Sequence, residues 1–225
     1  MKKYLILGVL FILPIIAYLF FASGVNNFVK LPVLTENVKE ITAFHALDGD
    51  EIRLHDKITV LGFLGMHPEK MKGNAFNINQ KIYKRFYQFS DFQFVMVLPE
   101  GKEEEARALK DELSPFTDMA KWEFVFGKEK DIADLFRSLQ SNVSLDESLS
   151  TPLVFIVDRE RKLRGRRKDE DSGNPLYGFD ATSVAELNDK MVDDVKVLLA
   201  EYRLALKKNN TTSKRDSYLK KLNKN

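Results

Sequence analysis

Residues 58–71 read Ile-Thr-Val-Leu-Gly-Phe-Leu-Gly-Met-His-Pro-Glu-Lys-Met, and this stretch decides the fold. The apolar run Ile58–Leu64 is typical of a strand buried on both of its faces. The segment after Pro68 has the pattern of a helix. We therefore predict a buried strand, a short loop and a helix in direct succession.

Strand and helix patterns alternate on both sides of this stretch. Ile41–Ala46 and Glu51–Leu54 flank Asp48-Gly49, which predicts a β-hairpin. Apolar residues at helical spacing predict one long helix from Met71 to Phe89. Further strands are expected at 92–98, 122–126, 152–158 and 162–167, and further helices at 103–113, 131–139 and 183–206. This alternation predicts an α/β domain in which helices flank a mixed β-sheet.

Composition excludes several functions. Hydrophobic residues make up 44% of the chain and charged residues 30%, which is ordinary for a folded domain. The net charge of +2 is too small to indicate a nucleic-acid partner. The chain has no cysteine, so it can form no disulfide and no thiolate metal site, and it cannot carry out thiol-disulfide exchange.

The N-terminus predicts a single-pass membrane protein. Lys2 and Lys3 precede an apolar run from Tyr4 to Phe21, long enough to cross a hydrocarbon core of about 30 Å. The lysines favour a cytoplasmic N-terminus, so the rest of the chain is expected on the periplasmic side of the inner membrane. Ala22-Ser23-Gly24 leaves open the alternative of a cleaved signal peptide.

The remaining boundaries follow from composition. We expect an anchor at 1–24, a linker at 25–39, one folded domain at 40–206 and a basic tail at 207–225. The tail lacks the apolar content to fold alone, so we expect disorder there. Its lysines could contact anionic lipids, or could simply be solvated.

Several stretches, in this order, resemble the Sco/SenC branch of the thioredoxin-like proteins. Leu47-Asp48-Gly49 is similar to that family's opening hairpin, and 60–71 to its strand and Cys-Pro-x-x-Cys loop. Val97-Leu-Pro-Glu100 resembles a Val-Asp-Pro-Glu strand end, and 122–135 a strand-Gly-helix unit. Thr151-Pro152 before Phe155-Ile-Val-Asp158 resembles the strand with a cis-proline that faces the reactive loop. The resemblance covers about residues 41–206 and implies a thioredoxin-like fold.

The resemblance implies a membrane-anchored protein that handles copper and assists cytochrome oxidase assembly. Carried over by position, the family's two cysteines fall on His67 and Met71, and its copper-binding histidine falls near Ser150. All three ligands are therefore replaced. The redox function is lost, and copper binding of the family type is put in doubt.

Two interpretations of the replaced loop remain. Met66, His67 and Met71 offer thioether and imidazole groups, which suit Cu(I), and residues four apart share one face of an α-helix. Alternatively, His67 forms a local hydrogen bond at a helix start, and the methionine fills a gap in the core.

The sequence thus leads to two functional hypotheses. In the first, the protein is a binding or assembly factor rather than an enzyme, and Leu64, His67, Pro68, Thr151 and Pro152 dock a protein partner in a respiratory or copper-handling complex. In the second, it carries Cu(I) through Met66, His67 and Met71. An enzyme with non-thiol chemistry is disfavoured because no motif supplies a paired acid and base.

Overall fold

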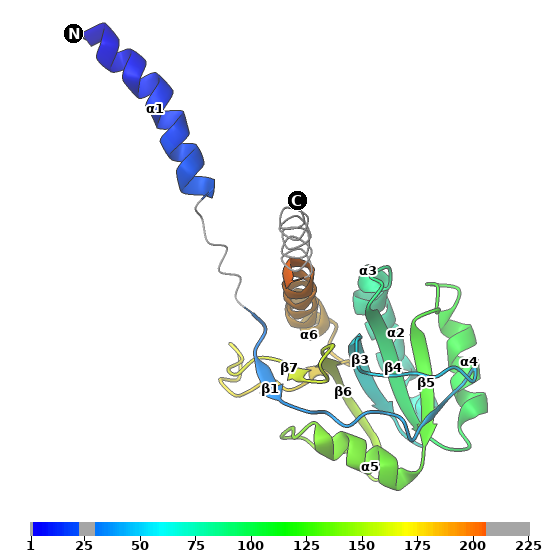
Figure 1. Cartoon of the computed structure of the whole chain (residues 1–225). Helices are drawn as coiled ribbons and strands as arrows, with labels where there is room; N and C mark the ends of the chain where they lie inside the picture. The colour runs from blue at the N-terminus through cyan, green and yellow to red at the C-terminus, as the bar shows by residue number, and fades with distance from the viewer. Residues whose placement is uncertain (1, 23–29, 206–225) are drawn as a thin grey trace, which may run out of the picture.

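The computed structural model describes residues 2–22 and 30–205 (Figure 1). Its strands are β1 (Val33–Thr35), β2 (His45–Ala46), β3 (Ile58–Leu64), β4 (Phe92–Pro99), β5 (Trp122–Gly127), β6 (Ser150–Val157), β7 (Leu163–Arg164) and β8 (Phe179–Asp180). The α-helices are α1 (Lys2–Ala22), α2 (Lys72–Ile78), α3 (Lys84–Phe86), α4 (Glu103–Leu113), α5 (Glu129–Ser138) and α6 (Val184–Glu186). A 3-10 turn, η1 (Pro68–Met71), precedes α2. The π-helical segments η2 (Asn79–Tyr83) and η3 (Leu187–Met191) follow α2 and α6, and an α-helix continues from η3 over 192–205.

The strands form one mixed sheet in the order β1-β7-β6-β3-β4-β5-β2, and β8 pairs with β6. β3 lies at the centre, parallel to β4 on one side and antiparallel to β6 on the other. β4 and β5 are also parallel. The predicted mixed sheet with flanking helices is confirmed, and the buried strand of the opening stretch is its central member.

Alternation along the central strands divides the core between the two faces of the sheet. One face carries Phe92, Phe94, Trp122 and Phe124, packed beneath the helices from α2 to α3 and the C-terminal helix. The rings of Phe94 and Trp122 stack with centroids 4.8 Å apart. The other face carries smaller residues of the same strands, together with Phe63 and Phe155, which pack against α5. Because both faces are covered, every residue of β3 and β4 is buried.

Three predictions about local structure need correction. The hairpin at Asp48-Gly49 is absent, because Ala46 pairs with Val125 of β5, and Glu51–Leu54 is not a strand. The expected linker contains β1, which pairs with β7, and Val38 is fully buried, so the folded part begins before residue 40. The helix predicted from Met71 to Phe89 ends at Phe86, and it is not one α-helix: the 3-10 turn η1 is followed by α2, the π-helical η2 and α3.

The π-helical segment η2 has a buried polar centre. Asn79 is fully buried, and its Oδ1 accepts a hydrogen bond from the hydroxyl of Thr117 at 3.0 Å. Its Nδ2 lies 3.5 Å from the sulfur of Met119. These contacts tie the helical layer to the segment that leads into β5. A buried amide without such partners would destabilise the fold.

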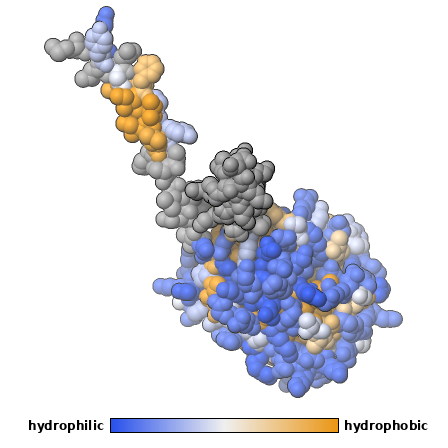
Figure 2. All heavy atoms as spheres, viewed as in Figure 1, coloured by the Kyte–Doolittle hydropathy of each residue, from blue (hydrophilic) through white to orange (hydrophobic). Residues whose placement is uncertain are grey.

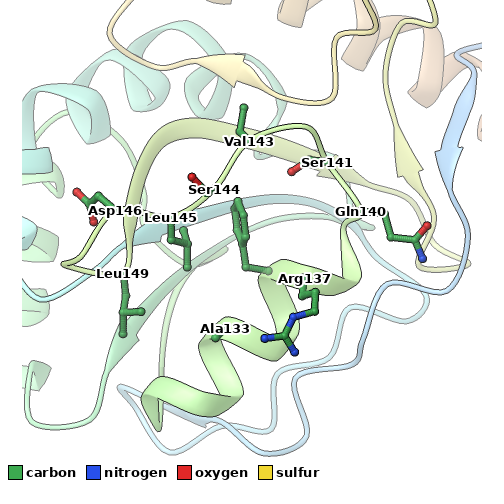
Figure 3. Close-up of a pocket in the computed structure, with 10 residues that line it drawn as sticks. Ala133, Arg137, Gln140, Ser141, Val143, Ser144, Leu145, Asp146 and Leu149 are labelled. Carbon is green, nitrogen blue, oxygen red and sulfur yellow. The ribbon is translucent and has the colours of Figure 1, made fainter.

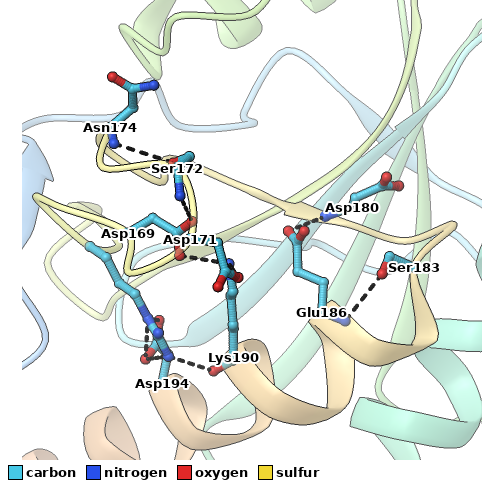
Figure 4. Close-up of polar contacts among 10 residues, drawn as sticks. Asp169, Asp171, Ser172, Asn174, Asp180, Ser183, Glu186, Lys190 and Asp194 are labelled. Carbon is cyan, nitrogen blue, oxygen red and sulfur yellow. Dashed lines mark hydrogen bonds and ion pairs between the residues drawn. The ribbon is translucent and has the colours of Figure 1, made fainter.

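The C-terminal helical segment is held to the loop after β7 by ion pairs (Figure 4). Arg166 donates to both carboxylate oxygens of Asp194, and Lys190 binds Asp169 at 2.6 Å. At the start of α6, the Ser183 hydroxyl caps the helix by accepting from the Glu186 backbone N–H. A second pair lies deeper, where the buried Arg164 binds the fully buried Asp158 at 2.8 Å.

The predicted anchor covers α1, and its last residues, 23 and 24, lie outside the described residues. Across the described part of the chain, no helix combines the length and the apolarity needed to cross a membrane. The predicted basic tail, 207–225, also lies outside the described residues.

Candidate functional site

The backbone of the loop that follows β3 contacts the backbone of the segment before β6. Gly65 adopts a left-handed conformation with φ +67°, and a Cβ built on it would lie 2.3 Å from the carbonyl oxygen of Ser148. The next residue, Met66, donates its backbone N–H to the same oxygen at 2.8 Å. The loop therefore lies directly against the segment before β6, which is where the resemblance places it.

His67 begins the 3-10 turn η1. Its φ and ψ of −126° and 65° are outside the helical region, and Pro68 occupies the first helical position. The imidazole does not cap the turn; its Nδ1 lies 3.2 Å from Oε1 of Glu69, and the side chain is 48% exposed. The geometry thus agrees with a local hydrogen bond at a helix start.

Met71 does not share the environment of His67. Residues four apart align on an α-helix, but His67 has non-helical backbone angles and Pro68–Met71 is a 3-10 turn, so this alignment does not apply to the pair. Met71 is half-buried against the aromatic core, and its sulfur lies 3.9 Å from Nδ2 of Asn74. The expectation that His67 and Met71 share one helix face is wrong for this reason.

Two of the three predicted copper ligands make contacts with different neighbours. His67 faces Glu69, and the sulfur of Met71 faces the helix and the core, so the two groups have different partners. No cluster of three histidine, aspartate or glutamate side chains with metal-site geometry occurs in residues 2–22 and 30–205. At the third family position, the Ser150 hydroxyl donates to Asp146 at 2.8 Å. Copper binding by Met66, His67 and Met71 therefore stays a prediction.

Asp146 was not predicted, yet it organises the segment that supports the loop. Its carboxylate accepts hydrogen bonds from the backbone N–H groups of Ser148 and Ser150. Burial opposes ionisation of this carboxyl, but these bonds together hold its pKa below the ordinary value. The sequence signal was Asp146-x-Ser-x-Ser150, because aspartate often binds backbone N–H groups two to four residues ahead.

Of the five predicted docking residues, three are buried and two are exposed. Leu64, Pro68 and Thr151 are buried, so they support the site but offer no surface. His67 and Pro152 are exposed. His67 follows the end of β3 and Pro152 lies near the start of β6, and these two strand ends are adjacent because Leu64 pairs with Ser150.

The expected cis peptide bond before Pro152 is wrong; the bond is trans. The register shows why proline is tolerated here. Gly62 pairs with Val154 and Phe63 with Thr151, so Pro152 and Leu153 form a bulge without partners on β3. Proline has no N–H to donate and fits a bulge without losing a ladder hydrogen bond. The Pro152 carbonyl accepts instead from the Ala181 N–H at 2.9 Å.

Comparisons with known proteins identify the fold class of the chain. No protein-family model matches the chain, and no curated protein matches its sequence. Solved structures do match. A putative protein disulfide isomerase from Bacteroides thetaiotaomicron is 15% identical with a TM-score of 0.52, over 76% of this chain and 95% of that one. The protein therefore has a thioredoxin-like fold.

Sco proteins are also among the solved structures that the chain resembles. The soluble domain of Sco1 from Bacillus subtilis is 15% identical, with a TM-score of 0.47 over 74% of this chain and 94% of that one. ScoI from Arabidopsis thaliana, solved with copper bound, is 17% identical, with a TM-score of 0.43 over 68% and 94%. The chain is thus similar to Sco proteins and thiol-disulfide oxidoreductases, although it contains no cysteine.

Proposed function

We propose that this protein is a binding or assembly factor that uses a thioredoxin-like frame without thiol chemistry. The observation that carries the proposal is the loop after β3. Its backbone is held by Ser148 and Asp146, yet the position of the reactive sulfur is occupied by His67, which is exposed. A rigid loop that presents a non-reactive side chain is suited to recognition rather than catalysis.

The proposed partner is a protein of a respiratory or copper-handling complex, as the resemblance to Sco proteins implies. His67 and Pro152 are the exposed members of the predicted docking set, one after the end of β3 and the other near the start of the adjacent strand β6. We propose that they form the docking surface. Leu64, Pro68 and Thr151 would hold this surface in shape from beneath.

We also propose, from the apolar sequence run Tyr4–Phe21, that the N-terminus anchors the protein in the inner membrane, with the domain in the periplasm, although the described helix α1 by itself does not meet the length and apolarity of a membrane span. The support is the sequence of the first 22 residues and the exposed apolar side chains of α1, such as Leu10, Phe11 and Leu13. Figure 2 shows hydrophobic residues along α1, whereas the visible face of the domain is mainly hydrophilic. Deleting residues 1–22 should release the protein from isolated membranes; a truncated protein that stays in the membrane fraction would contradict the anchor.

A crosslinking experiment tests the docking surface. A photo-crosslinking residue replaces His67 in the full chain, and a matched variant carries it at Lys130, which is exposed on α5. The His67 position should capture one membrane protein that the Lys130 position does not, and Pro152→Arg should abolish the capture. The same set of products from both positions, or capture unaffected by Pro152→Arg, would contradict the proposal.

A further inference from the structure

A cavity of about 560 Å³ lies between helix α5 and the loop of residues 140–149 (Figure 3). Ala133 and Phe136 of the helix line it from one side, and Val143, Leu145 and Leu149 of the loop line it from the other. Its volume lies in the range of small-molecule sites. These apolar side chains share the lining with the neutral polar side chains of Gln140 and Ser144. None of the residues predicted for docking or copper binding lines this cavity.

A hydroxyl without a partner lies in this lining. The Ser141 Oγ is buried and has no hydrogen-bond partner, a condition that it shares in the described part of the chain only with Nε1 of Trp122. Buried polar groups in folded proteins almost always have partners. Ser141 is one of the residues that line the cavity, but its hydroxyl is enclosed, so a molecule in the cavity does not reach it.

The charged groups of the cavity are already neutralised. The guanidinium of Arg137 binds Asp134 at 2.8 Å. The carboxylate of Asp146 accepts from two backbone N–H groups and from the Ser150 hydroxyl. The C-terminal end of α5 also adds a partial negative charge here, which disfavours an anion.

The loop is shaped before any ligand arrives. Gln140 and Leu149, near its two ends, adopt left-handed conformations with φ of 49° and 60°. Such conformations are unfavourable for residues other than glycine, so surrounding contacts must hold them. The Leu149 N–H donates to the Asp146 carbonyl and the Asp146 N–H to the Ser150 carbonyl, which supplies that support.

We propose that this cavity binds an uncharged, mainly apolar small molecule. The molecule would contact Phe136, Val143 and Leu145. The site is separate from the proposed docking surface, and its occupancy does not depend on the identity of the protein partner.

A titration of the full chain with β-naphthol tests the proposal, with β-naphthoate as the charged counterpart. The NMR signals of labelled valine and leucine methyl groups report binding, and those of Val95 and Val97, buried in β4, report the integrity of the fold. Naphthol should shift the signals of Val143 and Leu145 saturably. Ser141→Ala should leave naphthol binding unchanged, because the enclosed hydroxyl does not reach the ligand.

Two matched variants complete the test. Ala133→Phe places a ring in the cavity and should abolish the shifts, whereas Lys130→Phe places the same ring on the exposed side of α5 and should leave them unchanged. The absence of a saturable shift in the natural chain would overturn the proposal, as would equal binding by the Ala133→Phe variant with intact Val95 signals. Naphthoate binding as tight as naphthol would overturn the uncharged ligand class.

Discussion

Gly65→Ala tests whether the loop after β3 depends on its backbone geometry. A Cβ at this position would lie 2.3 Å from the Ser148 carbonyl oxygen and 2.9 Å from the Ser150 nitrogen. Both are backbone atoms and cannot rotate away. The loop must therefore separate from the segment before β6, or the chain must distort at both sites.

The expected cost follows from two contributions. A non-glycine residue at φ +67° costs about 1–2 kcal/mol. Separation also breaks the Met66–Ser148 hydrogen bond and weakens the Leu64–Ser150 pairing, each worth about 0.5–1.5 kcal/mol net. The free energy of unfolding should fall by about 3 kcal/mol, which lowers a urea midpoint by about 1.5 M if the urea dependence is about 2 kcal/mol/M.

Urea unfolding followed by tryptophan fluorescence measures this change. The chain has a single tryptophan, and Trp122 is fully buried in the aromatic face of the core. Gly73→Ala is the matched control, because nothing lies within 4 Å of the added Cβ and Gly73 lies in α2. The control should gain about 0.5–1 kcal/mol from helix propensity. A Gly65→Ala protein within about 1 kcal/mol of the natural chain would refute the account of the loop.

Three further predictions concern buried polar groups and the replaced ligands. Tyr83→Phe should cost about 1–3 kcal/mol, because the Tyr83 hydroxyl donates to the Asp118 carbonyl and accepts from the Lys121 N–H. Burial raises the pKa of Tyr83 from 10.0 to about 12, so ionisation of Tyr83 lowers the free energy of unfolding as pH rises between these values. Tyr83→Phe should remove this part of the alkaline destabilisation, and a variant with the same alkaline unfolding curve would contradict the prediction. Arg166→Gln should cost about 3–5 kcal/mol, since it leaves the buried Asp194 carboxylate unpaired. Burial raises the pKa of Asp194 even beside Arg166, so this carboxyl lowers the free energy of unfolding as pH rises from 3.8 through its folded pKa. Asp194→Asn should remove this pH dependence of the free energy of unfolding, measured by denaturation at several pH values. A pH dependence that persists in Asp194→Asn would show that another group causes it. Replacing His67 and Met71 together by alanine should leave Cu(I) affinity unchanged in a chelator competition, whereas a tenfold loss would show that the two side chains do converge on a metal.

The central strands could be predicted because burial on both faces leaves a direct mark on the sequence. The run Ile58–Leu64 coincides with β3, and the helix predicted at 103–113 coincides with α4. In both cases the pattern depends on the segment's own side chains. Local sequence therefore sufficed for these elements and for the fold class.

Errors arose where a distant segment decides the local structure. Asp48-Gly49 has the residues of a hairpin turn, but Ala46 pairs with β5 rather than with residues 51–54. Asp48 binds Lys110 of α4. The 3-10 turn after His67 and the bulge at Pro152 likewise depend on contacts with other segments. The position of the candidate site along the chain therefore stays a prediction, while the helix type after His67 and the peptide bond before Pro152 differ from those expected.

The bulge at Pro152 and Leu153 has an even length, and this has a consequence for how the protein could change. Strand residues alternate between the two sides of a sheet, so inserting a pair restores the original alternation beyond it. Lineages could add or remove both residues together and leave Thr151 and Ser150 on their present sides. Loss of a single one would reverse the start of β6 relative to β3 and disrupt the pairing of Ser150 with Leu64.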